Sequence, residues 1–311
     1  MALPETFIER FREIYPEDAD ALLKTFETKE RLSFRINPMK TDIKSALAEL
    51  EKEGTKPEPV EWYEYAFTVE AEMKDALSGS KLFETGQIYI QSLSSMLAPL
   101  ALEPLPGETV LDLAAAPGGK SLMIAAMMQN RGWLSVVEPG RDRFFRLKSN
   151  LERGGVEIAH FYMTDGRSVG AKCPAMFDRV LLDAPCTTEA KFRSSEPKSY
   201  AYWSERKIKE MSKLQNRLMI SAVKSLKPGG TLIYATCSFE PEENEAVVQK
   251  ALKKFPNLKI EPIALPLENI RPGLTSWRDK NFDPSLAQCV RVLPEGAMEG
   301  FFLAKLILQN R

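Results

Sequence analysis

The sequence has one histidine and few cysteines for its length. Its 311 residues include four cysteines, none of them in a C-x-x-C pair, and His160 has no other ligand type near it in the chain. The sequence therefore argues against a structural zinc site and a disulfide scaffold, and we expect no bound metal. A Ser-His-Asp or Cys-His enzyme would have to use His160, which follows an apolar run and is better explained as a packed or exposed side chain.

The chain also lacks an excess of either charge and any long apolar run. Forty-two basic residues face 43 acidic ones, so the net charge is -1. This argues against tight non-specific binding to nucleic acid and leaves room for a local basic patch. No segment has the roughly 20 apolar residues of a membrane span, and residues 1–20 are too charged for a signal peptide. We expect a cytoplasmic protein without a membrane partner.

The first part of the chain differs in pattern from the rest. Apolar residues at helical spacing begin the chain, with an interruption near Pro16, and 32–40 is typical of a short strand stopped by Pro38. Residues 41–54 predict a helix that ends at Gly54. We interpret residues 1–84 as a small α/β N-terminal module of an RNA-binding type.

Residues 85–311 are predicted to form a second, larger domain. From Thr109 onward, short apolar runs alternate with amphipathic helical segments, as in a Rossmann-like α/β fold with a mostly parallel sheet. The apolar run 300–308 is expected to be a final strand at the edge of this sheet.

Acidic residues stand at the ends of four successive predicted strands: Asp112, Glu138, Asp165 and Asp183. The first strand is followed by Gly118–Gly119, which lets the backbone turn tightly but lacks the spacing of a phosphate-binding loop. Each acid alone could be a solvated strand end. Together they suit a nucleoside cofactor without phosphates, such as S-adenosylmethionine, because a pyrophosphate would be repelled.

Two cysteines follow predicted strands in similar settings, Cys186 in "LLDAPCTTEA" and Cys237 in "LIYATCSFE". A single cysteine at a strand end is more often a small buried hydrophobic residue than a nucleophile. Two at neighbouring strand ends, in matching surroundings, favour a chemical role. Cys173 and Cys289 stand in no such motif and are expected to be structural.

Taken in order, these motifs resemble a known family. "DLAAAPGGK" (112–120), "DAPC" (183–186) and "ATCS" (235–238) are similar to the signatures of the NOL/NOP/Sun (RsmB/RsmF-like) RNA (cytosine-5)-methyltransferases. The segments "SFRINPMK", "GQIYIQSLSSMLAPLAL", "PEENEAVV" and "EGFFLAKL" extend the resemblance over about residues 32–308. One departure is "TTEAKF" after Cys186, where the family usually has a Ser-Gly-x-Gly run.

The resemblance implies an S-adenosylmethionine-dependent methyltransferase domain and its cofactor contacts. These contacts are Ala114, Ala115, Ala116, Pro117, Gly118, Gly119 and Lys120 around the methionine part, Glu138 at the ribose, Asp165 at the adenine amine, and Arg143 and Asp183. Asp183 would lie between the cofactor and the target base.

The resemblance also assigns roles to the cysteines. Carbon 5 of cytosine becomes a nucleophile when a thiolate adds to carbon 6, which is covalent catalysis. By resemblance, Cys237 is the attacking nucleophile, Cys186 assists product release and Asp183 contacts N3 of the base. A thiolate gains from a helix N-terminus, and a helix is expected to start near Pro241, shortly after Cys237.

RNA, either rRNA or tRNA with rRNA favoured, is the expected partner of a monomeric enzyme. The candidate contacts are the cations and aromatic residues Arg35, Lys120, Lys191, Arg193, Lys198, Tyr200, Tyr202 and Trp203. Two alternatives stay open. One is a methyltransferase acting on a different target, which would need no cysteine pair. The other is a catalytically silent RNA-binding or ribosome-assembly factor that keeps the fold.

Overall fold

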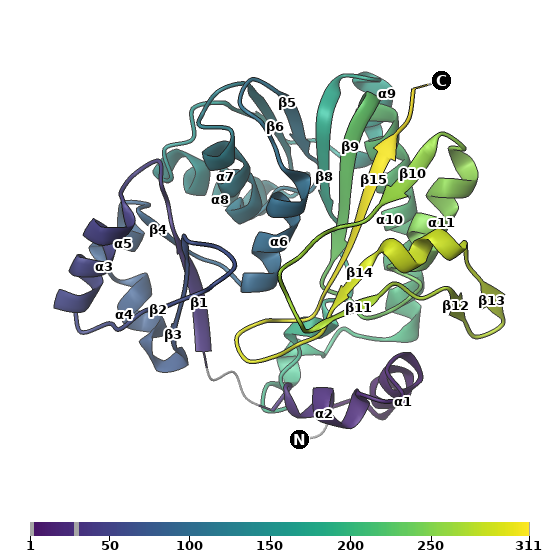
Figure 1. Cartoon of the computed structure of the whole chain (residues 1–311), viewed down its shortest axis with the longest axis horizontal. Coiled ribbons are helices and arrows are strands. Elements are labelled where there is room, and N and C mark those ends of the chain that lie inside the picture. Colours follow the sequence, from purple (N-terminus) through teal and green to yellow (C-terminus); the bar gives the residue numbers. More distant parts are fainter. Residues whose placement is uncertain (1–2, 28–30, 311) are drawn as a thin grey trace.

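The computed structural model describes residues 3–27 and 31–310 and is built around one large β-sheet (Figure 1). Across the sheet, the strands are β7 (Ala159–Tyr162), β6 (Trp133–Val137), β5 (Thr109–Asp112), β8 (Phe177–Asp183), β9 (Leu226–Thr236), β15 (Phe301–Leu308), β14 (Val290–Val292) and β11 (Ile270–Pro272). Strand β10 (Leu258–Glu261) also pairs with β15. A separate hairpin consists of β12 (Ser276–Trp277) and β13 (Lys280–Asn281).

The five strands from β7 to β9 are parallel, as the alternating sequence pattern predicted. After β7 the chain returns to the other side of β5 and enters β8, which creates a switch point between β5 and β8. In sheets of this kind, ligands bind at the carboxyl ends of the strands beside that point. The ends of β5 and β8 are Asp112 and Asp183, so the fold brings two of the predicted acids to the place where a cofactor is expected.

The expectation that the last strand forms the sheet edge is wrong. Strand β15 is antiparallel to β9 on one side and to β14 and β10 on the other. The two outer strands have only three and four residues. Segments this short carry little periodic signal, so the sequence did not indicate them.

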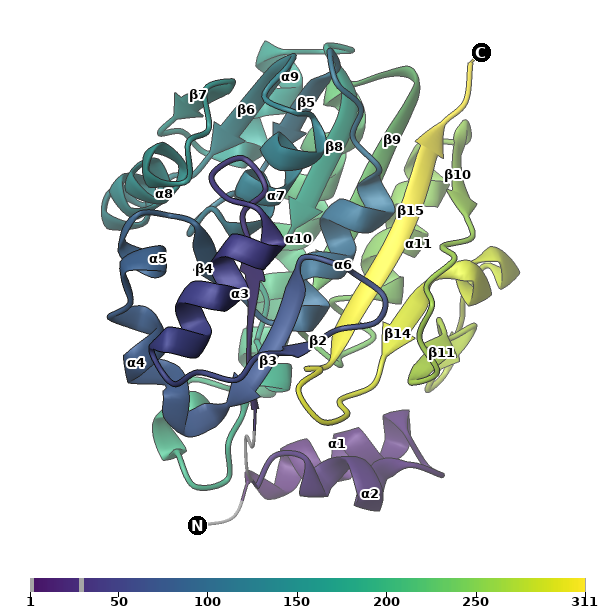
Figure 2. The same cartoon turned by 60° about the vertical axis from the view of Figure 1, so that its left-hand side comes forward.

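Helices cover both faces of the large sheet (Figures 1 and 2). One face packs against α6 (Leu93–Leu102), α7 (Gly119–Met127) and α8 (Arg141–Arg153). The other packs against α9 (Val169–Lys172), α10 (Glu205–Ser225) and α11 (Glu245–Lys254). Successive side chains of β5 point to opposite faces, so Val110 belongs to the first core and Leu111 to the second. Both faces are therefore buried, as a parallel sheet requires.

A second sheet belongs to the N-terminal part, with the order β2 (Glu58–Pro59), β3 (Ala66–Glu70), β1 (Arg31–Ile36) and β4 (Ile88–Ile90). The helices of this part are α3 (Ile43–Lys52), α4 (Lys74–Ser78) and α5 (Lys81–Glu84). Asp42 caps α3 by accepting a hydrogen bond of 2.9 Å from the Ser45 amide. Because β4 lies beyond residue 84 and pairs with β1, the expected boundary after residue 84 divides this sheet.

The first two helices pack on the large domain and not on the small sheet. These are α1 (Glu5–Ile14) and α2 (Ala19–Lys24), at the bottom of Figure 2. The ring centroid of Phe7 lies 5.1 Å from that of Phe192, and Phe11 is equally close to Phe239. Phe192 and Phe239 follow the two cysteine motifs closely in the chain, so α1 buttresses the loops that carry Cys186 and Cys237.

Candidate active site

A cavity of about 440 Å³ opens at the switch point between β5 and β8. Side chains from the small sheet, among them Ser33, Tyr89 and Gln91, form part of its wall, so both sheets contribute to it. Of the residues predicted from the sequence, its wall contains Ala114, Ala115, Ala116, Pro117, Gly119, Lys120, Arg143, Asp183, Cys186 and Lys191. Four other predicted residues do not line this cavity: Gly118, Glu138, Asp165 and Cys237.

The loop from β5 to α7 needs both of its glycines. Gly118 precedes α7 with φ at 109°, a conformation that side chains with a Cβ rarely adopt. A Cβ on Gly119 would lie 2.7 Å from Cε1 of Tyr89. The loop can therefore approach the small sheet closely only because this position carries no side chain.

Asp112 is a buried acid with an unused acceptor. Its Oδ2 accepts a hydrogen bond of 2.6 Å from Ser121 Oγ, whereas Oδ1 has no partner among the described residues. Burial raises the pKa of Asp112 to about 6. A buried carboxylate oxygen without a donor costs free energy unless a ligand supplies one. The amino group of a bound S-adenosylmethionine is a suitable donor.

Glu138 and Arg143 contact the loop that runs from β5 into the first turn of α7 (residues 113–120), which we call the cofactor loop. Glu138 is 2% exposed, accepts a hydrogen bond of 2.9 Å from the Gly140 amide and lies 3.4 Å from the Arg143 guanidinium. Arg143 donates to the carbonyl of Ala116 at 3.0 Å. This pair sets the position of the loop, and one carboxylate oxygen of Glu138 is held by the turn after β6.

Asp165 is engaged by a neighbouring cation. Its carboxylate accepts hydrogen bonds from the backbone amide and the guanidinium of Arg167, which hold its pKa below the ordinary value. The side chain is 44% exposed. For Asp165 to bind an adenine amine, as the resemblance implies, one of its oxygens would have to accept the amine beside Arg167 or in its place.

Lys120 and Asp183 form an ion pair between the cofactor loop and the end of β8. Lys120 Nζ lies 2.7 Å from Asp183 Oδ2 and 2.6 Å from Ser95 Oγ. The ring of Phe301 lies beneath the ammonium, 5.7 Å from ring centroid to Nζ. The Lys120 side chain is mostly buried and its charge is paired with Asp183, so little of that charge is available to RNA.

The two motif cysteines meet at the ends of β8 and β9. Their Sγ atoms are 3.3 Å apart, and all four cysteines are free thiols. Two sulfurs this close can share one proton in an S–H···S hydrogen bond. A hydrogen bond from Cys186 lowers the pKa of Cys237, and the same contact raises the pKa of Cys186. The two pKa shifts favour Cys237 as the sulfur that ionises first, although either sulfur can be the donor at this distance.

Lys191 is the cation whose charge acts on Cys237. It lines the cavity with an exposed side chain, and its pKa is raised chiefly by the negative charge of Cys237. The helix expected to begin near Pro241 starts at Glu245 instead, because residues 241–244 form turns. The pKa of Cys237 is lowered chiefly by the hydrogen bond from Cys186, and the charge of Lys191 adds to that shift while burial opposes it.

The RNA contacts expected from the sequence separate into exposed and engaged side chains. Lys191, Lys198 and Tyr202 are exposed, and Tyr202 reaches 87%. The others are held by internal contacts. Arg193 lies 3.6 Å from Glu299, the Trp203 ring lies 5.7 Å from that of Phe7, and the Tyr200 ring lies 5.8 Å from that of Phe192.

Arg35 is not available to RNA, contrary to the sequence-based expectation. Its side chain is fully buried; Nε donates to Gln91 Oε1 at 3.0 Å and a terminal nitrogen donates to the Gly119 carbonyl at 2.9 Å. It therefore ties strand β1 to the cofactor loop. The alternation of apolar and polar residues in β1 gave no sign of this contact, since a buried arginine is rare.

These residues fit S-adenosylmethionine. Its amino group matches the unpartnered Asp112 oxygen, which borders the cavity together with the backbone of residues 114–117. In the described part of the chain, no group of three or more His, Cys, Asp or Glu side chains could hold a metal ion. Nor does any helix there have the length and apolar character to cross a membrane.

The parallel sheet, the acids at its strand ends and the glycine turn without a phosphate loop define a class, the S-adenosylmethionine-dependent methyltransferases. The family model of the 16S rRNA methyltransferase RsmB/F matches residues 99–307. That of the N-terminal domain of 16S rRNA methyltransferase RsmF matches residues 3–93. The chain belongs to this family of RNA (cytosine-5)-methyltransferases. The family, the enzyme class and the cofactor expected from the sequence are thereby confirmed.

The names of similar proteins in this family specify different RNA substrates. The tRNA (cytosine(49)-C(5))-methyltransferase of Pyrococcus abyssi is 36% identical over 302 residues, which are 96% of this chain and 94% of the relative. The ribosomal RNA small subunit methyltransferase F of Cronobacter sakazakii is 36% identical over 317 residues, or 98% of this chain but 63% of the relative. The chain therefore spans less than two thirds of the latter.

A solved structure confirms the fold class. The methyltransferase homolog protein of Pyrococcus horikoshii superposes with a TM-score of 0.84 at 33% identity, covering 98% of this chain and 95% of that one. The match extends over the small N-terminal part as well as the large sheet.

Proposed function

We propose that this protein forms 5-methylcytosine in RNA through a covalent bond between Cys237 and carbon 6 of the target base. The observation that carries the proposal is the pair of sulfurs 3.3 Å apart at the ends of β8 and β9, with Lys191 beside them. A methyltransferase acting on an exocyclic amine would have no use for two juxtaposed thiols. The cofactor would supply an electrophilic methyl group on a sulfonium centre.

The first step is addition of the Cys237 thiolate to carbon 6. The carbon–sulfur bond forms, and the ring electrons move toward carbon 5, which can then take the methyl group. Lys191 holds the thiolate charge before attack, and Cys186 donates its S–H to the same sulfur. As the new bond forms, the sulfur loses its negative charge and no longer needs this donor.

Asp183 contacts N3 of the base in this proposal. It lies in the cavity wall between the cofactor loop and Cys186, and Lys120 fixes one of its oxygens at 2.7 Å. The other oxygen can accept a hydrogen bond from N3 once that nitrogen has taken up a proton from water, which stabilises the charge on the ring while the adduct exists.

Cys186 acts at the end of the reaction. After methyl transfer, a base removes the proton from carbon 5, the ring double bond re-forms and the Cys237 sulfur leaves. Because Cys186 lies within hydrogen-bonding distance of that sulfur, it can stabilise the departing thiolate. Without it, addition and methyl transfer proceed but elimination slows, so the protein remains attached to its RNA.

The proposed target is rRNA, because both family models are of 16S rRNA methyltransferases. A tRNA target is the second candidate, since the chain spans 94% of the Pyrococcus abyssi tRNA enzyme. The proposal includes action as a monomer in the cytoplasm, where a free Cys237 thiol stays reduced.

A trapping assay tests the proposal. Radiolabelled S-adenosylmethionine is mixed with rRNA or tRNA and with wild type, Cys186→Ala, Cys237→Ala or the double variant. We expect a labelled protein–RNA adduct that survives denaturing gels with Cys186→Ala and disappears in the double variant. Cys173→Ala is a matched control, since Cys173 lies away from the cavity wall, and should behave as wild type. Methyl transfer that persists in Cys237→Ala would refute the assigned nucleophile.

A further inference from the structure

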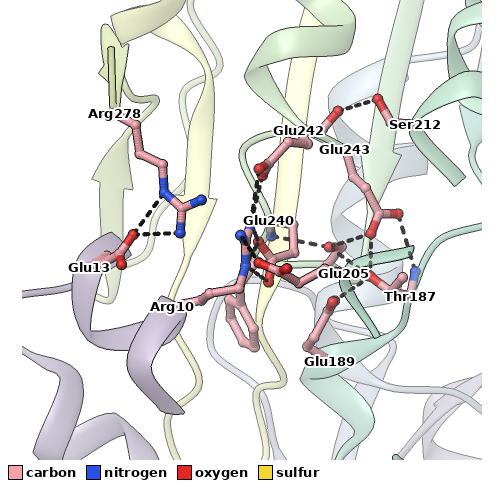
Figure 3. A network of polar contacts seen from close by, with 12 residues as sticks. Arg10, Glu13, Thr187, Glu189, Glu205, Ser212, Glu240, Glu242, Glu243 and Arg278 are labelled. Atoms are coloured by element: carbon pink, nitrogen blue, oxygen red, sulfur yellow. Dashed lines mark hydrogen bonds and ion pairs between the residues drawn. The ribbon is translucent and has the colours of Figure 1, made fainter. Parts of the chain in front are cut away.

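Two fully buried glutamates lie directly behind the cysteine loops. Glu189 belongs to the loop after Cys186, and Glu243 to the turns after Cys237. Both side chains are 0% exposed. Figure 3 shows them turned toward Thr187, the residue next to Cys186. The mechanism above does not use either glutamate.

Thr187 and Ser238 connect these acids to the two cysteines. The Thr187 hydroxyl hydrogen-bonds with Oε1 of both Glu189 and Glu243. Ser238, the neighbour of Cys237, places its hydroxyl 3.3 Å from Glu243 Oε1 and 3.3 Å from that of Thr187. The cluster thus joins the residue after each cysteine to the same pair of carboxyl groups.

Counting hydrogens shows that one of the acids is protonated. A threonine hydroxyl has a single hydrogen and can donate it to only one of the two carboxyl oxygens it contacts. Glu189 Oε1 also accepts from Trp203 Nε1 at 2.8 Å, whereas its Oε2 has no partner among the described residues, so we treat Glu189 as the acceptor of the pair. The contact between Thr187 and Glu243 then requires a hydrogen on Glu243, donated to the threonine oxygen.

The second oxygen of Glu243 is consistent with this assignment. Oε2 accepts from Gln215 Nε2 at 2.6 Å and from the Thr187 amide at 3.2 Å, so the proton resides on Oε1. The order of donation is therefore Glu243 to Thr187 to Glu189. Each hydrogen in this chain has one donor and one acceptor.

No cation neutralises this pair. Among residues 3–27 and 31–310, neither Glu189 nor Glu243 forms an ion pair with a lysine or arginine. Arg10 is the cation of the neighbouring network, and it is occupied by Glu240, Glu242 and Glu205 (Figure 3). Two ionised carboxylates in contact without a cation would repel each other strongly, and one bound proton removes that repulsion.

The other groups facing the pair agree with a bound proton. Burial raises the pKa of both acids, that of Glu243 to about 9, and the charge of Glu189 adds to the shift of Glu243. The Tyr234 hydroxyl donates to the backbone carbonyl of Glu243 and supplies no positive charge. The pKa of Glu240 is raised by burial to about 7, with Arg10 opposing the shift.

We propose that protonated Glu243 is a positioning residue: through Thr187, Ser238 and Glu189, it holds the Cys186 and Cys237 loops at the spacing that lets the sulfurs share a proton. Glu243 itself touches neither substrate nor cofactor. Its loss of the proton would place two charges at the junction of the loops and separate them. The inference rests on the proposed roles of the two cysteines.

The sign of the pH effect follows from the raised pKa. Glu243 favours its protonated form in the folded state, so its contribution to folding is complete below the ordinary carboxyl range near 4.5 and is lost as pH rises toward about 9. The organised spacing of the loops should fail at the upper end of that range. Methyl transfer by the wild type should therefore fall above about pH 9.

The decisive variant is Glu243→Gln, with Glu210→Gln as a matched control on the exposed side of α10. A glutamine amide can donate to Thr187 and accept from Gln215, as the protonated acid does. We expect Glu243→Gln to keep methyl transfer within about threefold of wild type near pH 7 and to lose the alkaline decline. We expect Glu243→Ala to lose about 100-fold, because the reacting sulfurs are no longer held in place.

A second measurement reports on the proton without activity. In protein carrying ¹³C at the glutamate side-chain carboxyls, one resonance should titrate near pH 9 in wild type and be missing in Glu243→Gln. Absence of any such resonance, or an unchanged alkaline decline in Glu243→Gln, would overturn the proposal. If no variant methylates any RNA, the proposed function fails, whereas the titration still decides whether Glu243 carries the proton. The titration also shows whether Glu243 carries the proton if the Glu243→Ala variant does not fold.

Discussion

Replacing Arg35 with methionine tests whether the small sheet controls the cofactor loop. Methionine matches much of the arginine length but cannot donate hydrogen bonds. The change leaves Gln91 Oε1 and the Gly119 carbonyl without their buried donors. Gly119 is the first residue of α7 and lines the cavity, so its carbonyl connects the loss directly to the cofactor site.

The size of the effect comes from two opposing contributions. Two buried hydrogen bonds from a charged group contribute together about 5 kcal/mol. Against this, burial lowers the pKa of Arg35 from 12.5 to about 10, which corresponds to about 3 kcal/mol against the charged form. Methionine removes both contributions, so we expect a net loss of about 2 kcal/mol in the free energy of unfolding. That is a fall of about 3 °C in Tm.

The assay pairs thermal unfolding with titration of S-adenosylmethionine by calorimetry. If the Gly119 carbonyl sets the loop, cofactor affinity should fall about tenfold, or about 1.4 kcal/mol. Arg31→Met is the control on the same face of β1. Arg31 binds the exposed Glu58 and Glu70, and its loss should cost under about 1 kcal/mol with unchanged affinity. A lower Tm for Arg35→Met with wild-type cofactor affinity would refute the proposed coupling.

Three further predictions concern the cavity and its mouth. Lys191→Met should raise the pH at which Cys237 is half alkylated by iodoacetamide, because the cation beside the thiolate is lost; Lys191→Arg should not. Cofactor affinity should weaken as pH falls through about 6, where Asp112 takes up a proton. In Asp112→Asn, calorimetry should show low cofactor affinity at every pH and no such pH dependence. Tyr202→Ala should weaken RNA binding in filter assays by about 1–3 kcal/mol without affecting cofactor affinity, whereas the likewise exposed Tyr162→Ala should leave RNA binding unchanged.

The placement of the strand-end residues was predictable because it depends on local pattern. Apolar runs of strand length before Asp112 and Asp183 predict where each strand ends, and parallel pairing brings the ends to one edge. The two cysteines follow strands of the same sheet, so their proximity also follows from the order of strands. The distance of 3.3 Å between their sulfurs agrees with that expectation.

The surroundings of these residues depend on contacts between distant parts of the chain. The sequence could not indicate that Arg35 is buried against Gly119 or that β15 lies inside the sheet. It also favoured a helix N-terminus as the source of the Cys237 thiolate, where the structure has Lys191.

By itself, the sequence determined the family, the succession of strands and helices along the chain and which side chains stand at the carboxyl ends of the parallel strands, because motifs and periodicity are properties of neighbouring residues. Only the tertiary structure decided how those side chains are charged. Whether Glu243 keeps its proton and Cys237 loses one depends on burial and on partners brought together from separate segments. The free energy of an ionised group is set by the dielectric and the charges around it in space, and the chain acquires those only when it folds.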